Sequence, residues 1–141
     1  MEQCVALVLA RRLSSFRAYC DGKDELAPFV RLDALCVKAF SLLTENRVVS
    51  RTALFSDTSM NDDADIFQSF STAFGPLVAA CRPDWSQSKA ERRTFALTAA
   101  LIQAFLRPDV VLRGQGIDLS QSAERSTFFT QLLRDILDFG R

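Results

Sequence analysis

The stretch that decides the fold is TFALTAALIQAFL, residues 94–106, which contains no charged side chain. At about 100° per residue, Phe95 and Ile102 fall on one side of a helix, and Leu97 and Leu101 fall on much of the opposite side. A helix that is apolar nearly all round is normally surrounded by protein. The run is well short of the roughly 20 residues needed to cross a bilayer. We therefore predict that residues 94–106 form the central helix of a compact bundle.

Thr98 and Gln103 are polar side chains inside this run. They are candidates for contacting a ligand in the interior. Polar groups at such positions are more often satisfied by local hydrogen bonds or placed at the edge of the bundle, and we expect that here.

The segments on either side of the run also show helical periodicity, with apolar residues spaced at i, i+3 and i+4. The predicted helices cover residues 5–20, 24–46, 50–55, 62–78, 86–108 and 118–139, with a kink or break at Gly75-Pro76. The chain of 141 residues is of ordinary size for one domain. The sequence thus predicts an all-α protein, residues 1–141, folded as a single bundle of about five to seven helices.

A short echo links two of the predicted helix starts. SQSKAERRTF, residues 86–95, returns as SQSAERSTFF, residues 120–129, with one residue deleted. In the first copy either Ser86 caps the helix or Ser88 and Glu91 form a capping box. In the second copy the helix start is capped either by Asp118 with Gln121 as a capping box or by Ser120. The similarity ends at the phenylalanines, and helical repeat arrays need about three units. We interpret the echo as convergent capping; an old duplication is the alternative.

The charge balance argues against polyanionic partners. The chain carries 17 basic and 17 acidic residues, whereas proteins that bind nucleic acid or acidic membranes usually carry a basic surplus. We expect no nucleic-acid partner and no membrane association.

The four cysteines, Cys4, Cys20, Cys36 and Cys81, never form a C-x-x-C pair and lie among apolar or helical neighbours. This pattern is typical of buried free thiols and favours a reducing, intracellular and cytoplasmic location over a disulfide framework.

Catalytic chemistry is constrained by the complete absence of histidine. Imidazole bases, serine or cysteine nucleophiles activated by histidine, and histidine-ligated metals are excluded. The acidic loop 57–68 has oxygen ligands at several EF-hand positions, but Asp62 stands where glycine is needed and Gln68 where the bidentate glutamate is needed. We predict no enzyme, no cofactor and no metal site; an enzyme using Asp62, Asp63 and Asp65 alone is a poorly supported alternative.

A helix-turn-helix is a further alternative for residues 48–70. Its second helix would have to enter the major groove with its N-terminal residues leading. Asp62, Asp63 and Asp65 stand there, and phosphates repel carboxylates. A DNA-binding regulator is therefore disfavoured.

The last predicted helix has an apolar half that is wider than one core usually requires. Either the helix is wedged between two others of the same chain, or one edge contacts a partner. On the second interpretation, Phe129, Leu133 and Leu137 are the candidate protein-interaction residues, and a homodimer is the expected assembly.

These observations favour a non-enzymatic regulatory or adaptor protein that binds another protein and forms a homodimer. The alternative from another class is a small-molecule-binding helical domain whose apolar pocket lies among the 12 phenylalanines.

Overall fold

The computed structural model describes Arg11, residues 27–55 and residues 66–139. Within these residues the chain forms six helices and no strand, which confirms the predicted all-α bundle. The helices are α2 (Pro28–Glu45), α3 (Arg47–Phe55), α4 (Ile66–Cys81), α5 (Gln87–Leu106), α6 (Pro108–Gln115) and α7 (Ser122–Ile136).

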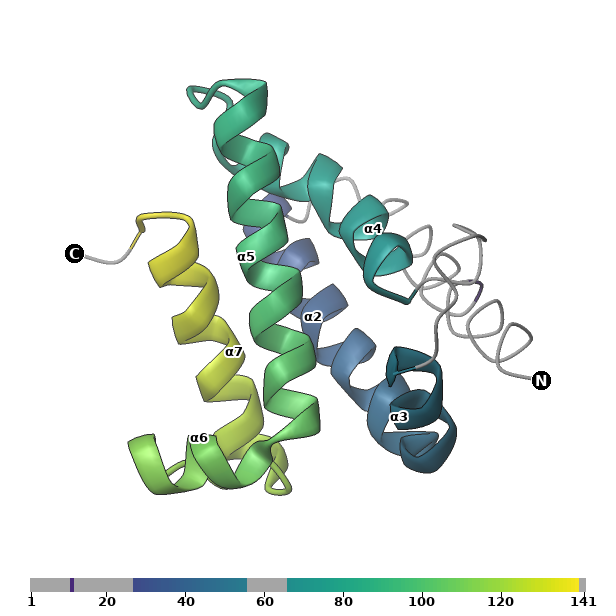
Figure 1. The fold of residues 1–141 in the computed structure, drawn as a ribbon. Coiled ribbons are helices and arrows are strands. Elements are labelled where there is room, and N and C mark those ends of the chain that lie inside the picture. Colours follow the sequence, from purple (N-terminus) through teal and green to yellow (C-terminus); the bar gives the residue numbers. More distant parts are fainter. Residues whose placement is uncertain (1–10, 12–26, 56–65, 140–141) are drawn as a thin grey trace.

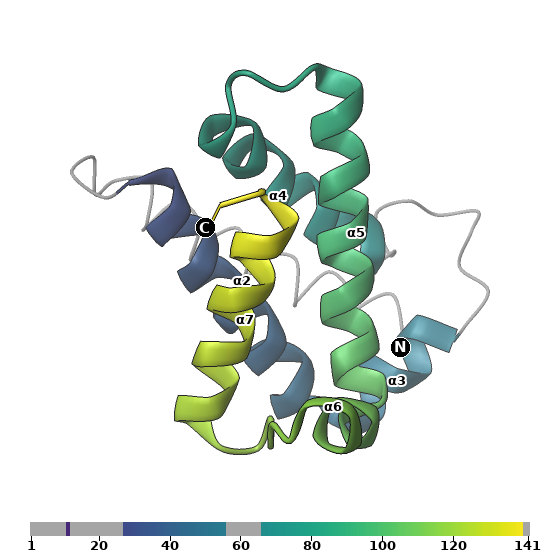
Figure 2. The same cartoon turned by 90° about the vertical axis from the view of Figure 1, so that its left-hand side faces the viewer.

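The centre of the bundle is shared by two helices. α5 packs against α2, α4, α6 and α7, and α2 packs against α3, α4, α5 and α7. Figures 1 and 2 show α5 and α7 running side by side with α2 behind them and α4 on the other flank of α5. Residues 94–106 thus belong to a central helix, as predicted, but α2 has an equal share in the centre.

The core is continuous and rich in aromatic rings. Phe70 and Phe74 of α4 have their centroids 6.0 Å apart, and Phe40 of α2 lies 5.1 Å from Phe129 of α7. All four rings are almost completely buried. Tilted ring pairs of this kind add about 0.5–1.5 kcal/mol to the stabilisation from burial alone. The Phe40–Phe129 pair therefore joins α2 and α7, which are distant in sequence, and the Phe70–Phe74 pair lies within α4.

The start of α5 confirms one of the two caps that the sequence offers. Ser86 has an extended backbone, and its hydroxyl accepts a hydrogen bond of 3.1 Å from the backbone N–H of Lys89. The alternative capping box does not form, because Glu91 accepts from the Gln87 side chain instead. In the second copy of the echo Ser120 is not the cap; Gln121 occupies that position without a side-chain hydrogen bond.

Pro108 ends α5, as predicted, and also begins a helix that the sequence did not predict. α6 turns by 96° from the axis of α5 and buries none of its side chains completely. Proline is well suited to the first turn of a helix, since it lacks only an N–H that would have no partner there. Gly116, with a φ of 70°, ends α6 in the left-handed conformation that glycine adopts without strain.

The charge-free run is buried on one side and exposed on the other. Leu97, Leu101 and Phe105 are buried, but Phe95 is 61% exposed and Gln103 also faces solvent. Thr98 is fully buried; its hydroxyl donates to the Thr94 carbonyl at 2.9 Å and accepts from Ser71 at 3.1 Å. The Thr98 hydroxyl therefore makes local hydrogen bonds, as expected. The expectation that the helix is surrounded by protein on all sides is wrong within the described residues.

The three candidate interaction residues of the last helix are core residues. Phe129, Leu133 and Leu137 are each 0% exposed, because α7 is wedged between α2 and α5. A side chain without exposed surface cannot contact a second protein while the fold is intact. The assignment of these three residues to an interaction surface is thus corrected: the apolar half of α7 serves the interior of its own chain.

Several sequence-based expectations fall outside the described residues. These are the helix over residues 5–20 with Cys4 and Cys20, the acidic loop up to Asp65, and the leading residues of the helix-turn-helix alternative. Among the described helices no single one is long and apolar enough to span a membrane; α5 and α6 pass that test only when taken together, across their 96° bend.

Thiol labelling tests the burial of the two cysteines that the structure describes. Both are free; Cys36 is fully buried and Cys81 is partly buried. Burial raises the pKa of Cys81 to about 11, and the pKa of Cys36 is also raised. Since the thiolate is the reactive form, a variant with Cys4→Ser and Cys20→Ser is expected to react slowly with iodoacetamide at pH 8 and to label both cysteines after denaturation. Labelling in the folded state as fast as in urea would contradict this packing.

Candidate functional site

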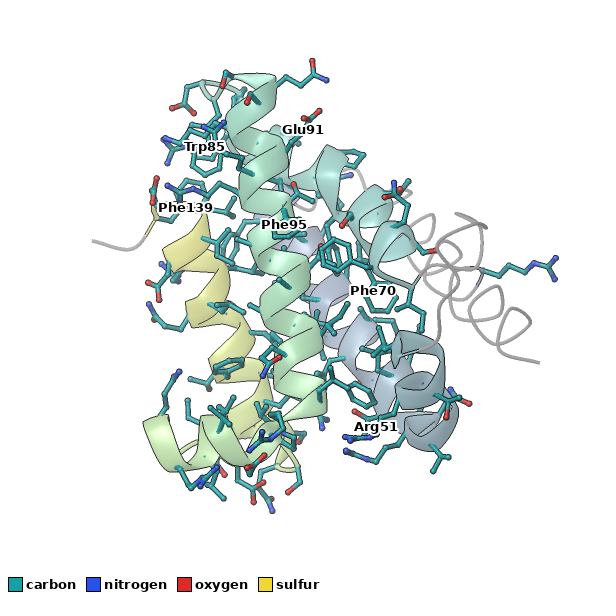
Figure 3. The ribbon with its side chains drawn as sticks, viewed as in Figure 1. Arg51, Phe70, Trp85, Glu91, Phe95 and Phe139 are labelled. Carbon is teal, nitrogen blue, oxygen red and sulfur yellow. The ribbon has the colours of Figure 1, made fainter. Side chains whose placement is uncertain are left out.

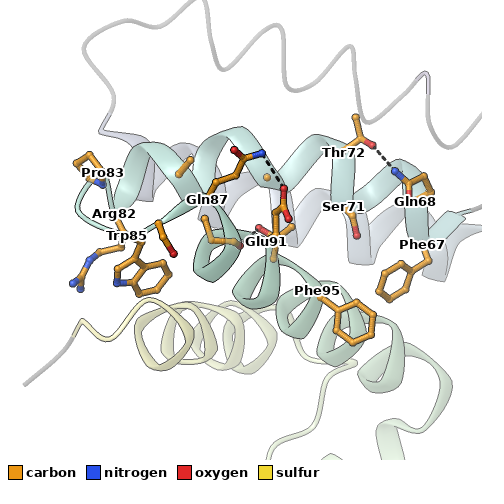
Figure 4. A pocket seen from close by; sticks show the side chains of 15 residues that line it. Phe67, Gln68, Ser71, Thr72, Arg82, Pro83, Trp85, Gln87, Glu91 and Phe95 are labelled. Atoms are coloured by element: carbon orange, nitrogen blue, oxygen red, sulfur yellow. Dashed lines mark hydrogen bonds between the residues drawn. The ribbon is translucent and has the colours of Figure 1, made fainter.

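An open groove of about 710 Å³ lies between α4 and α5. It begins near the Phe67 and Phe95 rings and ends near Arg82 and Trp85, where α4 passes into α5 (Figure 4). Grooves of this volume fall in the size range of ligand and peptide sites. The groove is therefore the first candidate for a functional surface.

Small residues line the middle of the groove. α4 contributes Ser71, Gly75 and Ala79, which follow one another at four-residue spacing, and α5 contributes Ala90 and Thr94. A row of residues at i, i+4 and i+8 lies along one face of a helix. Because these side chains are short, the backbones of α4 and α5 are accessible from the groove.

Gly75 marks the most open point of this row. A methyl group placed on its Cα would meet no atom within 4 Å, so the space above it is free. Its φ lies outside the left-handed region, so other residues fit the backbone there. The glycine is not required by the fold of α4, and its effect is to keep the groove wide.

The residue after this glycine leaves a backbone acceptor without its usual donor. The sequence predicted a kink or a break at this point; α4 continues through Pro76 to Cys81, so it is not broken there. Proline has no N–H, and the carbonyl four residues earlier, that of Thr72, loses its helical hydrogen bond. Thr72 is exposed and lines the groove. A residue that lines the groove therefore lacks the usual i+4 donor for its carbonyl.

Aromatic rings form one end of the groove. Phe67 of α4 and Phe95 of α5 have centroids 5.2 Å apart and planes inclined by 55°. Figures 3 and 4 show Phe95 on the side of α5 that faces α4, beside the groove and outside the core. Phe95 is 61% exposed, and within the described ranges it is the largest side chain among the exposed large hydrophobic residues. Exposed aromatic side chains beside a groove are typical of protein-contact surfaces.

The opposite end of the groove is basic and aromatic. Three cations surround the Trp85 ring: Arg82 at 4.9 Å, Lys89 at 4.8 Å and Arg93 at 5.2 Å from its centroid. Arg82 pairs with Asp84 at 2.9 Å and Arg93 pairs with Asp138 at 3.1 Å. Lys89 makes no ion pair within the described part of the chain. Lys89 lies beside the Trp85 ring, outside the lining of the groove, and its charge acts on the Asp84 carboxylate.

The two paired arginines also hold the end of α7 in place. Arg93 donates to the Ile136 carbonyl at 2.6 Å, and Arg82 donates to the Leu137 carbonyl at 2.9 Å. The last carbonyls of a helix have no intrahelical donor and carry partial negative charge, which guanidinium groups satisfy. The hydrogen bonds from Arg82 also lower the pKa of the Asp84 carboxyl. The basic end is accordingly a fixed part of the bundle.

Polar side chains border most of the groove, and one of them, Glu91, carries a carboxylate. On one rim Gln87 donates to Glu91 at 3.1 Å, and on the other Gln68 donates to Thr72 at 3.4 Å. Both pairs are exposed and drawn as dashed lines in Figure 4. An apolar centre with a polar rim is the usual organisation of a protein interface.

The groove contains none of the residues that the sequence had suggested for binding a partner. Phe129, Leu133 and Leu137 lie in the core, and of the acidic loop 57–68 the structure describes Ile66, Phe67 and Gln68 alone. Within the described ranges no three His, Cys, Asp or Glu side chains come together as a metal site. The groove could have been predicted from the four-residue spacing of Ser71, Gly75 and Ala79, together with the apolar surface of α5 that the core does not use.

No protein-family model, no curated protein sequence and no solved structure matches this chain, so its function has to be inferred from the groove and its surroundings.

Proposed function

We propose that this chain is a non-enzymatic adaptor or regulatory domain that binds another protein, and that its α4–α5 groove receives an amphipathic helix of that partner. The observation that carries the proposal is the row of small residues between α4 and α5, ending at the exposed ring of Phe95. Binding an amphipathic helix in a groove is a common mode of protein recognition.

The shape of the groove favours a helix as the occupant. Helices pack by placing the ridge of side chains of one in the furrow of another, with axes about 8–10 Å apart. The short side chains of Ser71, Gly75 and Ala79 make such a furrow. A third helix laid over α4 and α5 would extend the packing that already joins these two helices.

The two ends of the groove define the chemistry of the partner. Phe67 and Phe95 suit an apolar residue such as leucine or methionine, since aromatic anchors contribute strongly to interfaces. The Lys89 ammonium group beside Trp85, just outside the groove, suits an acidic residue that extends past this end of the groove. The expected partner segment therefore has an apolar face, small or aliphatic residues at its centre and a carboxylate near one terminus.

Filling the groove tests the proposal. Gly75→Leu places a side chain in the open space without displacing an atom near the new Cβ, and leucine is about 0.8 kcal/mol better than glycine inside a helix. We expect full retention of the fold, together with a loss of at least about tenfold in affinity, or about 1.4 kcal/mol, for helical peptides selected against the wild type. Peptides from a display library patterned as an amphipathic helix serve as the probe, with affinity measured by fluorescence anisotropy.

Gly114→Leu is the matched control. Gly114 also lies in a helix with nothing within 4 Å of an added Cβ, but it belongs to α6, away from the groove. This variant is expected to bind the peptides as the wild type does. Selected peptides that bind both leucine variants equally, or whose amide shift changes fall on α6 and α7, would contradict the groove as the docking site.

A homodimer, which the sequence favoured, would have to use a surface other than Leu133 and Leu137. Light scattering measures the mass in solution. A dimer that Gly75→Leu converts to a monomer would make the partner helix a segment of a second copy; a monomeric wild type leaves a different protein as the partner.

A further inference from the structure

A second cavity, of about 360 Å³, lies at the end of the bundle where α6 crosses beneath α5. Apolar side chains from α2, α5, α6 and the loop after α6 form much of its wall: Phe40, Phe105, Pro108, Leu112 and Leu119. Its volume is at the lower end of the range for small-molecule sites. The cavity is separate from the α4–α5 groove and shares no lining residue with it.

Arg125 lines this cavity, and one edge of its guanidinium group has no acceptor within the described residues. Nη1 of Arg125 donates to the Leu119 carbonyl at 3.2 Å, but Nε is buried and has no hydrogen-bond partner. Nη2 likewise makes no hydrogen bond within the described residues. The Nε and Nη2 hydrogens point in parallel from one edge, an arrangement that matches the two oxygens of a carboxylate or phosphate group. A buried donor without an acceptor is uncommon in proteins and calls for a partner.

A second unpaired arginine lines the same cavity. The guanidinium of Arg47 lies 5.4 Å from the centroid of the Phe105 ring, which holds it by a cation–π contact. It makes no ion pair with any residue in the described ranges. Arg47 and Arg125 thus bring two positive charges to one largely apolar cavity.

The acidic residues of the cavity do not neutralise these arginines. Asp109 is held by Arg107 and Arg113, each at 2.9 Å, and its pKa is lowered to about 2 by the hydrogen bonds from Arg107. The carboxylate of Asp118 accepts from the backbone N–H and the hydroxyl of Ser120, at 3.0 and 2.6 Å. Both carboxylates therefore have other donors, and neither accepts a hydrogen bond from Arg125 within the described residues.

We propose that this cavity binds a small amphiphilic oxyanion, with its carboxylate or phosphate head on the free edge of Arg125 near Arg47 and its apolar body against Phe40 and Phe105. The apolar wall excludes a bare inorganic anion as the best ligand, because it would leave that wall empty. The two arginines likewise exclude a neutral hydrocarbon.

Titration of the full chain with defined probes tests this site. Octanoate and octyl phosphate carry both head and body, acetate carries the head alone, and octanol carries the body alone. We expect octanoate or octyl phosphate to move the Nε–Hε NMR signal of Arg125 downfield and to raise the melting temperature. Acetate and octanol should bind at least about tenfold more weakly. The stronger of the two amphiphiles identifies the head group.

Arg47→Gln is expected to weaken amphiphile binding at least about fivefold, since one of the two charges is removed. Arg92→Gln is the control, because Arg92 is exposed and its side chain donates to Ser88 on α5, outside the cavity. Arg125→Lys keeps the charge but removes the parallel donors, and it also assigns the NMR signal. The proposal would be overturned if octanol bound as tightly as octanoate, or if Arg47→Gln bound the amphiphiles as well as the wild type does. It would also be overturned if the Arg125 signal did not shift at amphiphile concentrations up to about 10 mM, a generous limit for ligands of this size.

Discussion

Leu133→Glu is expected to unfold the protein instead of separating two copies of it. Leu133 is 0% exposed in the core between α7, α2 and α5. The substitution removes leucine packing worth about 2–5 kcal/mol and buries a carboxylate that has no partner there. Since a domain of this kind has about 5–15 kcal/mol of total stability, we expect loss of most helical signal in circular dichroism at neutral pH.

The control for this experiment lies on the same helix. Thr127 is exposed on α7, and Thr127→Glu adds the same charge at the surface. Surface changes of this type are usually within about 0.5 kcal/mol, so this variant should melt like the wild type. A folded Leu133→Glu protein with half the wild-type mass in light scattering would show that Leu133 lies in a dimer contact and that this core is wrong.

Phe105→Ala is expected to lower the free energy of unfolding by about 3–5 kcal/mol, the usual cost of removing a buried phenylalanine. Phe105 is 1% exposed and belongs to the continuous core. Ile102, on the same helix, is 9% exposed and lies outside that core cluster. We expect Ile102→Ala to cost less, about 2 kcal/mol, because part of the new space opens toward solvent. Urea melts of both variants give the comparison.

Phe95→Ala completes the series on α5. The Phe95 ring is 61% exposed and touches only the edge of the bundle at Phe67. Its removal is expected to lower the free energy of unfolding by less than about 1.5 kcal/mol, the scale of one aromatic pair. It is also expected to weaken the binding of peptides selected against the groove. A loss as large as that of Phe105→Ala would place Phe95 in the core and remove the groove's aromatic end.

Helix content was predictable from sequence because it depends on local spacing. The apolar positions of residues 28–45 and 87–106 repeat at helical intervals, and both segments are helices of nearly the predicted length. α6 was missed for a physical reason. It has eight residues and buries no side chain completely, so it leaves little periodic signal, and Pro108 was interpreted only as an end.

The position of each helix in the bundle was not predictable in the same way. The apolar half of α7 fitted burial and partner contact equally well, and only the placement of α2 and α5 around it decides for burial. In the charge-free run of α5 the outcome was the opposite, because a side chain expected to be buried is exposed. Its apolar character predicted complete encirclement, yet Phe95 faces solvent because no helix among the described residues covers that side.

The sequence of the groove contains the Gly75-Pro76 pair, which was interpreted from the sequence as a kink or break in the helix. Gly75 and Pro76 are typical of a helix end, and α4 nevertheless continues through them. In the folded chain Gly75 leaves an open space on the helix surface, and Pro76 removes the usual donor to the Thr72 carbonyl. Whether a glycine marks a turn or a contact surface depends on its neighbours in three dimensions.

The most direct test of the groove as a protein-docking site is site-specific photocrosslinking in the native cell. A benzophenone amino acid at Phe95 places the reactive group at the aromatic end of the groove, and the same residue at Val110, which is 47% exposed on α6, is the control. We predict a discrete crosslinked protein from the Phe95 position that disappears when Gly75→Leu is present and persists with Gly114→Leu. Equal crosslinking from both positions, or a product that survives Gly75→Leu, would contradict the account.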